Sequence, residues 1–262
     1  MNNSTIVFIG GGNMAGALIG GLIAAGIAPG RIRASEPDAA RREALAREHG
    51  IVAEHDNVRM IEGADVVVFA VKPQVLGKVA QECANAIRAA RPLVISIAAG
   101  VSTTNLAGWL GGDMPIVRAM PNTPALVGCG AAGLYANEQV TVAQRETASS
   151  ILRAAGEAIW IEDESLMDTV TAVSGSGPAY FFLVIEAMEA AGIELGLAPD
   201  DARRLVAQTA LGAATMAHRR DVDAAELRRR VTSPGGTTAA ALHVFEEGGL
   251  RELITRALTA AR

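Results

Sequence analysis

The first apolar run of the chain ends in glycines whose spacing suits a dinucleotide. Phe8–Ala15 reads Phe-Ile-Gly-Gly-Gly-Asn-Met-Ala, a Gly-x-Gly-x-x-Ala turn that joins an expected strand to an expected helix. Gly10 permits the tight turn, Gly12 lets a pyrophosphate approach the backbone, and the small Ala15 lets helix and strand pack closely. The N–H groups at the helix start then face the anion. The pattern predicts dinucleotide binding, with a purely structural glycine-rich turn as the alternative.

The ribose of a bound dinucleotide would lie just after the second expected strand. This segment contains Ser35 and Glu36, and Arg41 and Arg42 follow a turn later. An acid here favours NAD because a carboxylate binds the 2′-hydroxyl, whereas a serine with arginines favours the 2′-phosphate of NADP. The sequence leaves both open, and solvated helix residues explain the two arginines equally well.

Polar and small residues follow three further expected strands, at the edge where open parallel sheets bind ligands. Val71–Pro73 contains Lys72, which either contacts the cofactor or is a solvated lysine before a helix. Ser96–Gly100 offers small residues beside which a flat nicotinamide ring fits. Arg118–Pro124 is stiffened by two prolines, and its Asn122 is either a substrate-side hydrogen-bonding group or a turn former.

Two motifs rich in glycine and serine, Ser174–Pro178 and Thr232–Thr238, precede expected helices. Proline suits the first position of a helix, because the N–H that it lacks would have no partner there. Each motif therefore predicts a helix that begins at its proline, with Gly177 and Ser233 as the N-caps.

The second of these motifs also offers backbone donors. If the helix begins at the proline, Gly235, Gly236 and Thr237 lie in its first turn, where their free N–H groups can hold a carboxylate. Thr238 places a hydroxyl just beyond. Glycine and threonine weaken a helix start, so we favour an anion site over a simple capped helix.

Residues that commonly carry acid–base or metal chemistry are sparse. The four histidines show no metal-ligand spacing with acids or cysteines, so we expect no metal. The sequence contains no Gly-x-Ser-x-Gly nucleophile elbow. The expected crevice offers no histidine or pair of acids for proton transfer. A hydride acceptor that already carries its proton would need none.

Short β-branched runs alternate with Ala-rich helical stretches up to Ile161, which predicts a Rossmann-like, doubly wound α/β sheet. Val66–Val71 is almost continuously apolar, as in a strand buried on both faces of a parallel sheet. The other expected strands are Thr5–Ile9, Arg31–Ser35, Leu93–Ile97, Ile116–Ala119, one or two edge strands in Val127–Tyr135, and Ala158–Ile161. The expected helices are Asn13–Ala25, Pro37–Glu48, Pro73–Ala90 and Val140–Ala154.

Strand-like runs stop after Ile161, which predicts a dinucleotide-binding domain over 1–161 and an all-α domain over 162–262. Pro178–Ala191 is apolar on almost every side, and such a helix must be covered all round. We therefore expect burial against a second copy of the chain. The other expected helices are one capped by Asp200 and Asp201 that ends near His218, then Ala224–Arg230, Pro234–Glu246 and Gly249–Ala261.

Composition excludes several classes of protein. The 262 residues are 50% hydrophobic and 19% charged, which excludes a disordered chain. The longest apolar runs fall far short of the ~20 residues that span a bilayer, and no signal-peptide core is present. Two cysteines make no disulfide framework. We expect a soluble protein of the reducing cytoplasm.

Nucleic-acid binding is also disfavoured by composition. The net charge is −5 and aromatic residues make up 3% of the chain, so neither a basic surface nor a base-stacking platform is expected. The one basic run, Arg228–Arg230, is interpreted as a solvated helix face.

Taken together, these motifs make the sequence resemble the pyrroline-5-carboxylate reductase family. The matching segments occur in family order through nearly the whole chain: Phe8–Ala15, Ala70–Pro73, Ser96–Gly100, Arg118–Pro124, Ser174–Tyr180 and Ser233–Thr238. The resemblance implies a Rossmann domain followed by a helical dimerisation domain that interlocks with its dimer mate, and rings of dimers occur in the family. Two departures are Arg228–Arg230, where many relatives carry an acid, and Glu36, where several carry a small hydroxyl or basic residue.

The resemblance implies reduction of the C=N bond of 1-pyrroline-5-carboxylate to L-proline, the last step of proline biosynthesis. The donor is NADP(H) more than NAD(H), a preference that Glu36 puts in doubt. The carboxylate of the substrate would lie on Gly235–Thr237, and Thr238 would bind the ring nitrogen as the catalytic residue. The substrate set is Asn122, Ser233, Gly235, Gly236, Thr237 and Thr238. The cofactor set is Ile9, Gly10, Gly11, Gly12, Asn13, Met14, Ser35, Glu36, Asn57, Ala70, Val71, Lys72, Pro73 and Ala98.

Two rival functions remain open. A reductase of another cyclic imine, such as the six-membered homologue, differs by one methylene, which changes discrimination by only ~1–3 kcal/mol. A non-catalytic redox sensor would bind the dinucleotide and a partner protein without turnover. Gly235–Thr238 argues against the sensor, since a sensor needs no cradle for an imino acid.

Overall fold

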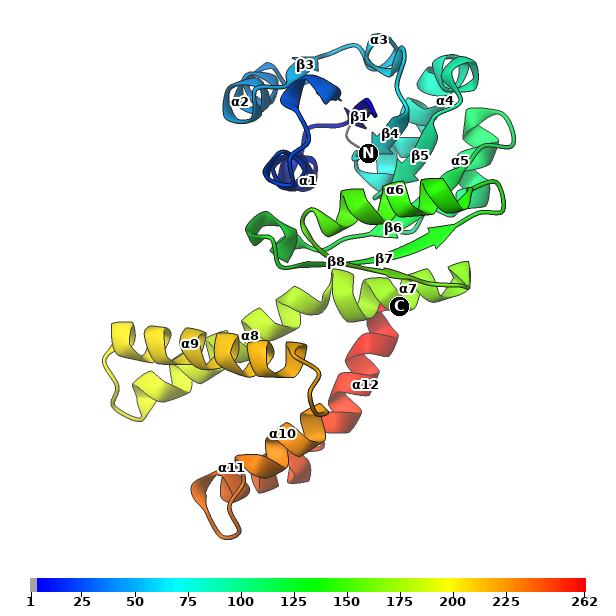
Figure 1. The fold of residues 1–262 in the computed structure, drawn as a ribbon. Helices are drawn as coiled ribbons and strands as arrows, with labels where there is room; N and C mark the ends of the chain where they lie inside the picture. Colours follow the sequence, from blue (N-terminus) through cyan, green and yellow to red (C-terminus); the bar gives the residue numbers. More distant parts are fainter. Residues whose placement is uncertain (1–3) are drawn as a thin grey trace. The chain divides into compact units, whose positions relative to one another are not determined.

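The computed structural model describes residues 4–262, and the chain divides into two compact units after Ser176 (Figure 1). The expected boundary lay after Ile161. The first unit extends further because Met167 and Ala172, in the helical residues that follow, are buried within it.

An eight-stranded sheet in the order β3-β2-β1-β4-β5-β6-β7-β8 forms the frame of the first unit. All neighbouring strands are parallel except β6 and β7. The strands are β1 Ile6–Ile9, β2 Ile32–Ser35, β3 Val52–Glu54, β4 Val66–Phe69, β5 Leu93–Ser96, β6 Ile116–Met120, β7 Gly130–Ala136 and β8 Gly156–Trp160. The doubly wound arrangement predicted from the sequence is confirmed.

Apolar side chains cover both faces of this sheet. In β1, Ile6 and Phe8 pack into one cluster while Val7 and Ile9 pack into the other, because successive side chains point to opposite faces. The first cluster contains residues of α1 Asn13–Ala24, α2 Ala39–His49 and α6 Val142–Arg153. The second contains residues of α3 Asn57–Ile61, α4 Pro73–Ala90 and α5 Thr103–Leu110. Helices on both faces explain the continuous apolar run in β4.

The sequence patterns did not predict the shortest elements, and they misplaced one strand in the order of the sheet. The strand β3 and the helices α3 and α5 were not predicted, since three to eight residues carry little periodicity. The expectation of an edge strand in Val127–Tyr135 was wrong, because β7 pairs with both β6 and β8 and the edges are β3 and β8. A short helix, η2 Thr123–Val127, precedes β7.

Helical segments follow one another from Glu164 to Glu194, with a bend at Ser176. They comprise η3 Glu164–Leu166, α7 Met167–Val170, the π-helical η4 Thr171–Gly175 and α8 Gly177–Glu194. A helix begins here as the sequence predicts, but its first residue is Gly177, one residue before the expected Pro178, so Gly177 is not the N-cap. By length and composition alone this segment could cross a membrane, which corrects the expectation that no segment is long enough.

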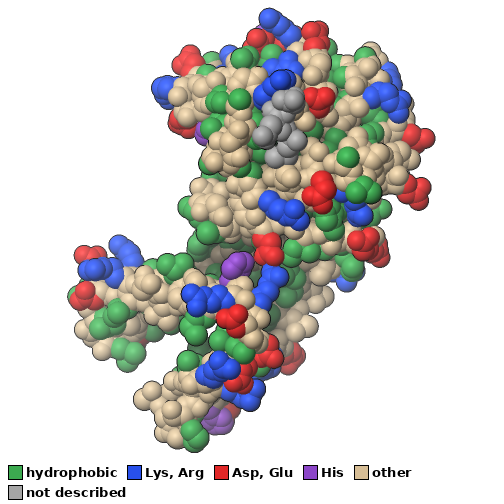
Figure 2. All heavy atoms as spheres, viewed as in Figure 1, with side chains coloured by type: hydrophobic (Ala, Val, Ile, Leu, Met, Phe, Trp, Pro, Cys, Tyr) green, Lys and Arg blue, Asp and Glu red, His purple; other side chains and the backbone are tan. Residues whose placement is uncertain are grey.

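The remaining helices of the second unit carry many exposed apolar side chains, drawn in green among charged ones in Figure 2. They are α9 Pro199–His218, α10 Ala224–Arg230, α11 Thr237–Glu247 and α12 Leu250–Ala261. The N-cap of α9 is Ala198, so Asp200 and Asp201 lie in its first turn instead of capping it.

Candidate functional site

The turn after β1 requires glycine at its first position. Gly10 has φ +100°, and a Cβ there would lie 2.7 Å from the carbonyl oxygen of Ala70. Its N–H donates to the Ser35 carbonyl at 2.8 Å, which ties the turn to the end of β2. The chain therefore reverses against two neighbouring strands, as the sequence predicts.

At Gly12, by contrast, no contact among the described residues requires a glycine. It is the N-cap of α1 with φ −71°, and a Cβ at this position would meet nothing within 4 Å. No acidic side chain lies in the first turn of α1, whose N–H groups have no intrahelical partner. The missing side chain leaves an open, positively polarised helix start, which fits the pyrophosphate of a dinucleotide.

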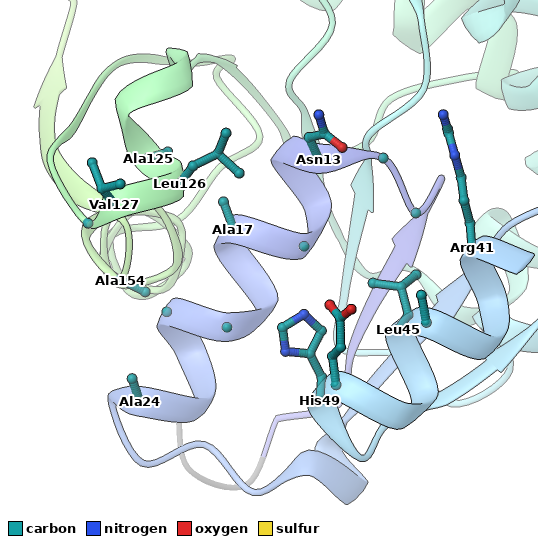
Figure 3. Close-up of a pocket in the computed structure, with 18 residues that line it drawn as sticks. Asn13, Ala17, Ala24, Arg41, Leu45, His49, Ala125, Leu126, Val127 and Ala154 are labelled. Carbon is teal, nitrogen blue, oxygen red and sulfur yellow. The ribbon is translucent and has the colours of Figure 1, made fainter.

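A groove of about 630 Å³ runs from this turn along α1 (Figure 3). Leu126 and Val127 of η2 line one side of α1, and Leu45 and His49 of α2 line the other. Of the predicted cofactor residues, only Gly11, Gly12 and Asn13 line this groove.

The predicted residues at the ribose end lie together after β2. The Ser35 hydroxyl donates to Asn57 Oδ1 at 2.6 Å, and Asn57 begins α3. The buried Glu36 accepts N–H groups from Gly11 at 2.8 Å and from Asp38 at 3.0 Å. The side chains of Ser35 and Glu36 are thus held within the fold.

The predicted nicotinamide-side residues follow β4, which pairs with β1, and β5, which pairs with β4 in the parallel part of the sheet. Lys72 is the exposed N-cap of α4, and no partner of its ammonium occurs among residues 4–262. Ala98 is buried beyond the end of β5. Val71 and Pro73 are half-buried beside Lys72. The carboxyl edge of the sheet therefore gathers these residues, as expected for parallel strands.

Asn122 is buried and its amide is used within the first unit. Its Oδ1 accepts the N–H of Ala131 at 2.9 Å, and its Nδ2 donates to the Ser174 carbonyl at 3.1 Å. In an α-helix that carbonyl would accept from residue 178, which here is a proline without an N–H. Asn122 thus satisfies a carbonyl that Pro178 leaves open, a role that the sequence did not reveal.

A charged cluster near Asn122 was also missed. Arg118 of β6 pairs with Asp168 at 2.7 Å and lies 3.7 Å from Glu164. Glu164 accepts from the N–H and hydroxyl of Thr103, at 2.7 and 2.8 Å. These bonds tie α5, β6 and α7 together. The Arg118–Pro124 motif contains the arginine of this cluster. Its acidic partners could not be recognised because they lie more than 40 residues away in sequence.

The second glycine motif is a turn and not a helix start. The N–H of Gly236 donates to the Ser233 carbonyl at 3.0 Å, and Gly235 between them has φ +69°. Pro234 followed by a glycine of positive φ is typical of a type II turn. The helix α11 begins at Thr237 with Gly236 as N-cap, so the expectation of Ser233 as N-cap was wrong.

Because α11 begins at Thr237, its free backbone donors lie further along the chain than expected. The first-turn N–H groups of α11 belong to Thr237, Thr238 and Ala239, whereas that of Gly236 is used in the turn. The Thr238 hydroxyl has no hydrogen-bond partner in the part of the chain that the structure describes. The end of the motif thus offers free backbone N–H donors at the start of α11, next to a free hydroxyl.

The basic run on α10 is paired instead of simply solvated. Arg229 and Arg230 pair with Glu226 one turn earlier, and Arg228 lies 3.7 Å from Glu246 of α11. This run therefore links α10 to α11.

Clustered metal ligands and the buried cysteine would be further sources of chemistry in the described residues. No group of three or more metal-ligating side chains occurs among residues 4–262. Burial, with the negative charge of Glu82 adding to it, raises the pKa of the Cys83 thiol to about 12. A thiol with that pKa is no nucleophile at neutral pH.

Comparisons with known proteins cover both parts of the chain. The family model described as pyrroline-5-carboxylate reductase dimerisation matches residues 164–262, and the one described as NADP oxidoreductase, coenzyme F420-dependent, matches residues 5–100. A pyrroline-5-carboxylate reductase of Pseudomonas aeruginosa is 52% identical over 261 residues, covering 100% of this chain and 95% of the relative. The chain belongs to the pyrroline-5-carboxylate reductase family.

Solved structures agree with this assignment. A pyrroline-5-carboxylate reductase of Coxiella burnetii has a TM-score of 0.95 at 46% identity, covering 99% of this chain and 96% of that one. A Plasmodium falciparum pyrroline carboxylate reductase with NADP bound has a TM-score of 0.87 at 31% identity, covering 100% of this chain and 96% of that one. The expected order, a Rossmann-like domain followed by a helical dimerisation domain, is confirmed.

Proposed function

We propose that the protein reduces the C=N bond of 1-pyrroline-5-carboxylate to L-proline with a reduced nicotinamide dinucleotide, as the last step of proline biosynthesis. The full-length likeness to reductases of this name carries the proposal. The glycine turn after β1 and the anion-binding start of α11 supply the two binding features that the reaction needs.

The substrate carboxylate binds at the start of α11 in this proposal. The free N–H groups of Thr237 and Thr238 supply the donors, and the turn Ser233–Gly236 leaves them open. The free Thr238 hydroxyl accepts the N–H of the protonated ring nitrogen. Asn122 belongs to the predicted substrate set, and we assign it the role of holding the Ser174 carbonyl.

The dinucleotide binds at the turn after β1, and its nicotinamide, when bound, supplies the hydride. Asn13 and Met14 offer their N–H groups to the pyrophosphate, and Lys72 and Ala98 lie at the reactive end of the sheet edge. No side chain needs to deliver a proton, because an imine can be protonated by water before it binds. Catalysis then rests on positioning, which is worth up to ~7–11 kcal/mol.

The assembly and surroundings belong to the same proposal. The protein acts in the cytoplasm as a homodimer or a ring of dimers, without metal, nucleic acid or membrane. The exposed apolar side chains of the second unit, within the residues that match the dimerisation family, support self-association.

One assay tests the reaction. Purified protein is mixed with 1-pyrroline-5-carboxylate, and loss of absorbance at the reduced-nicotinamide band is followed with NADPH and NADH in parallel. Rapid oxidation supports the proposal, and a higher kcat/KM for the five-membered than for the six-membered imine supports the ring size. No oxidation with either donor, in protein that still binds dinucleotide, would overturn it in favour of another imine or the sensor.

A further inference from the structure

The carboxylate of Glu36 is a fixed negative charge beside the glycine turn. Its side chain is 7% exposed, and each oxygen accepts one backbone N–H, from Gly11 and from Asp38. A carboxylate oxygen accepts about two hydrogen bonds, so each keeps one lone pair for a further donor. Moving the side chain away would leave the N–H of Gly11 without its acceptor, so the charge stays in place.

Among residues 4–262, no cationic side chain forms an ion pair with this carboxylate. The guanidinium of Arg42 donates to the carbonyl oxygens of Glu36 and Pro37, at 2.8 and 2.7 Å, and forms no ion pair with the carboxylate. Arg41 extends from the first turn of α2 beside the groove and is exposed (Figure 3). Its charge is screened by solvent more than that of the buried carboxylate. In the part of the chain that the structure describes, the carboxylate of Glu36 is therefore a buried anion without an ion pair at the end of β2.

We propose that Glu36 makes this chain prefer NADH over NADPH. The inference rests on the proposed function, because it concerns the donor of that reaction. In this fold the ribose of the dinucleotide lies at the end of the second strand. A ribose hydroxyl donates to the free lone pairs of Glu36, whereas a 2′-phosphate places a second anion against a buried carboxylate.

Dinucleotide affinity tests this preference without turnover. Calorimetric titration compares NAD+ with NADP+, and 5′-AMP with 2′,5′-ADP, for the wild-type protein and for Glu36→Gln and Glu36→Ser. We expect the wild type to bind NAD+ at least about tenfold more tightly than NADP+, and both variants to close most of that gap. The control Glu43→Gln, which removes an exposed carboxylate from α2, leaves the ratio unchanged.

Several outcomes would overturn the proposal. One is that the wild type binds NADP+ as tightly as NAD+ or more tightly. Another is that Glu36→Gln changes both affinities equally. A third is that Arg41→Ala changes the ratio of the NAD+ and NADP+ affinities more than Glu36→Gln does. None of these outcomes contradicts the proposed reaction if the imine is still reduced. Absence of imine reduction with either donor, by contrast, speaks against the reaction and not against Glu36. Retained NAD+ binding shows that the variants keep a folded turn.

Discussion

The three glycines in the turn after β1 are glycine for different physical reasons. Gly10 is required by its positive φ and by the Ala70 carbonyl, whereas at Gly12 nothing in the protein excludes a side chain. At Gly11 a Cβ would lie 2.5 Å from Leu45 Cδ1. The spacing in the sequence predicts Gly10 and Gly12, whereas Gly11 stands at a position that the pattern leaves open. The bond from Gly11 to Glu36 could not be predicted, since it joins residues 25 apart and depends on the register of β1 and β2.

Replacing the Thr238 hydroxyl tests the assignment of the catalytic residue. In Thr238→Ala we expect kcat/KM for the imine to fall about 10- to 100-fold, because a hydrogen bond to a charged group is worth about 1.5–3 kcal/mol. Dinucleotide affinity, measured by calorimetry, stays unchanged because Thr238 is not part of the glycine turn. Thr238→Ser, which keeps the hydroxyl, retains most of the activity. Wild-type kcat/KM in the alanine variant would remove Thr238 from the catalytic residues.

At the scale of elements, the two predicted helix starts had different outcomes, because α8 begins at Gly177, next to the expected Pro178, whereas α11 begins at Thr237 and not at Pro234. A proline after small residues suits the first position of a helix, but it also suits a type II turn or a helix whose open carbonyl finds another donor. Pro234 lies in the turn that the Gly236 N–H closes onto the Ser233 carbonyl. Pro178 lies in a helix, and Asn122 donates to the Ser174 carbonyl in its place. Local sequence cannot separate these outcomes, because Asn122, which accommodates Pro178, lies more than 50 residues earlier.

Asn122 and Pro178 should therefore be energetically coupled. Asn122→Ala leaves the half-buried carbonyl of Ser174 without this donor, so we expect the free energy of unfolding to fall by about 1–3 kcal/mol. In the Pro178→Ala background the helix regains its own N–H, and the same substitution should cost about 1 kcal/mol less. Urea unfolding of the four proteins measures both values. Equal costs in the two backgrounds would show that the carbonyl does not depend on Asn122.

The ion pairs between α11 and α12 should make stability depend on pH. The hydrogen bond from Arg251, with the charge of Arg228 adding to it, holds the pKa of Glu246 below its ordinary value of 4.5. A carboxyl whose pKa is lower in the folded than in the unfolded state stabilises the fold above its unfolded pKa. That contribution is lost as pH falls through the folded pKa.

Melting temperatures from pH 7 to pH 3 measure this contribution. We expect Glu246→Gln to melt below the wild type at pH 7 and the two curves to meet in the acid range. The difference is small because the pair is fully exposed and screened by solvent. Glu252→Gln, which removes a carboxylate of α12 that forms no ion pair among residues 4–262, is the control. A difference that persists unchanged to pH 3 would contradict the assignment.

At the scale of the whole molecule, repeating patterns predict more than single residues do. The alternation of strands and helices predicts the parallel sheet, because apolar runs such as β4 can be buried only between two layers of helices. The same reasoning applied to Pro178–Ala191 predicts that its apolar surface is covered, yet Phe181 is 71% exposed within a single chain. The sequence predicts a second copy of the chain as the covering partner but does not specify which of its faces packs against α8, since that depends on how two folded chains fit together.

Self-association should therefore be disrupted by a charge on α8. The wild type should sediment at twice 27.0 kDa or more at micromolar concentration, and Phe181→Glu combined with Phe182→Glu should shift the mass towards 27.0 kDa. The two phenyl groups are 71% and 63% exposed in the isolated chain, so the substitutions remove no intrachain core. Val142→Glu, at a residue 80% exposed on α6 and outside the dimerisation match, is the matched control and should leave the mass unchanged. A wild-type mass of 27.0 kDa, or an equal effect of both changes, would mean that the apolar surface of α8 is not the interface.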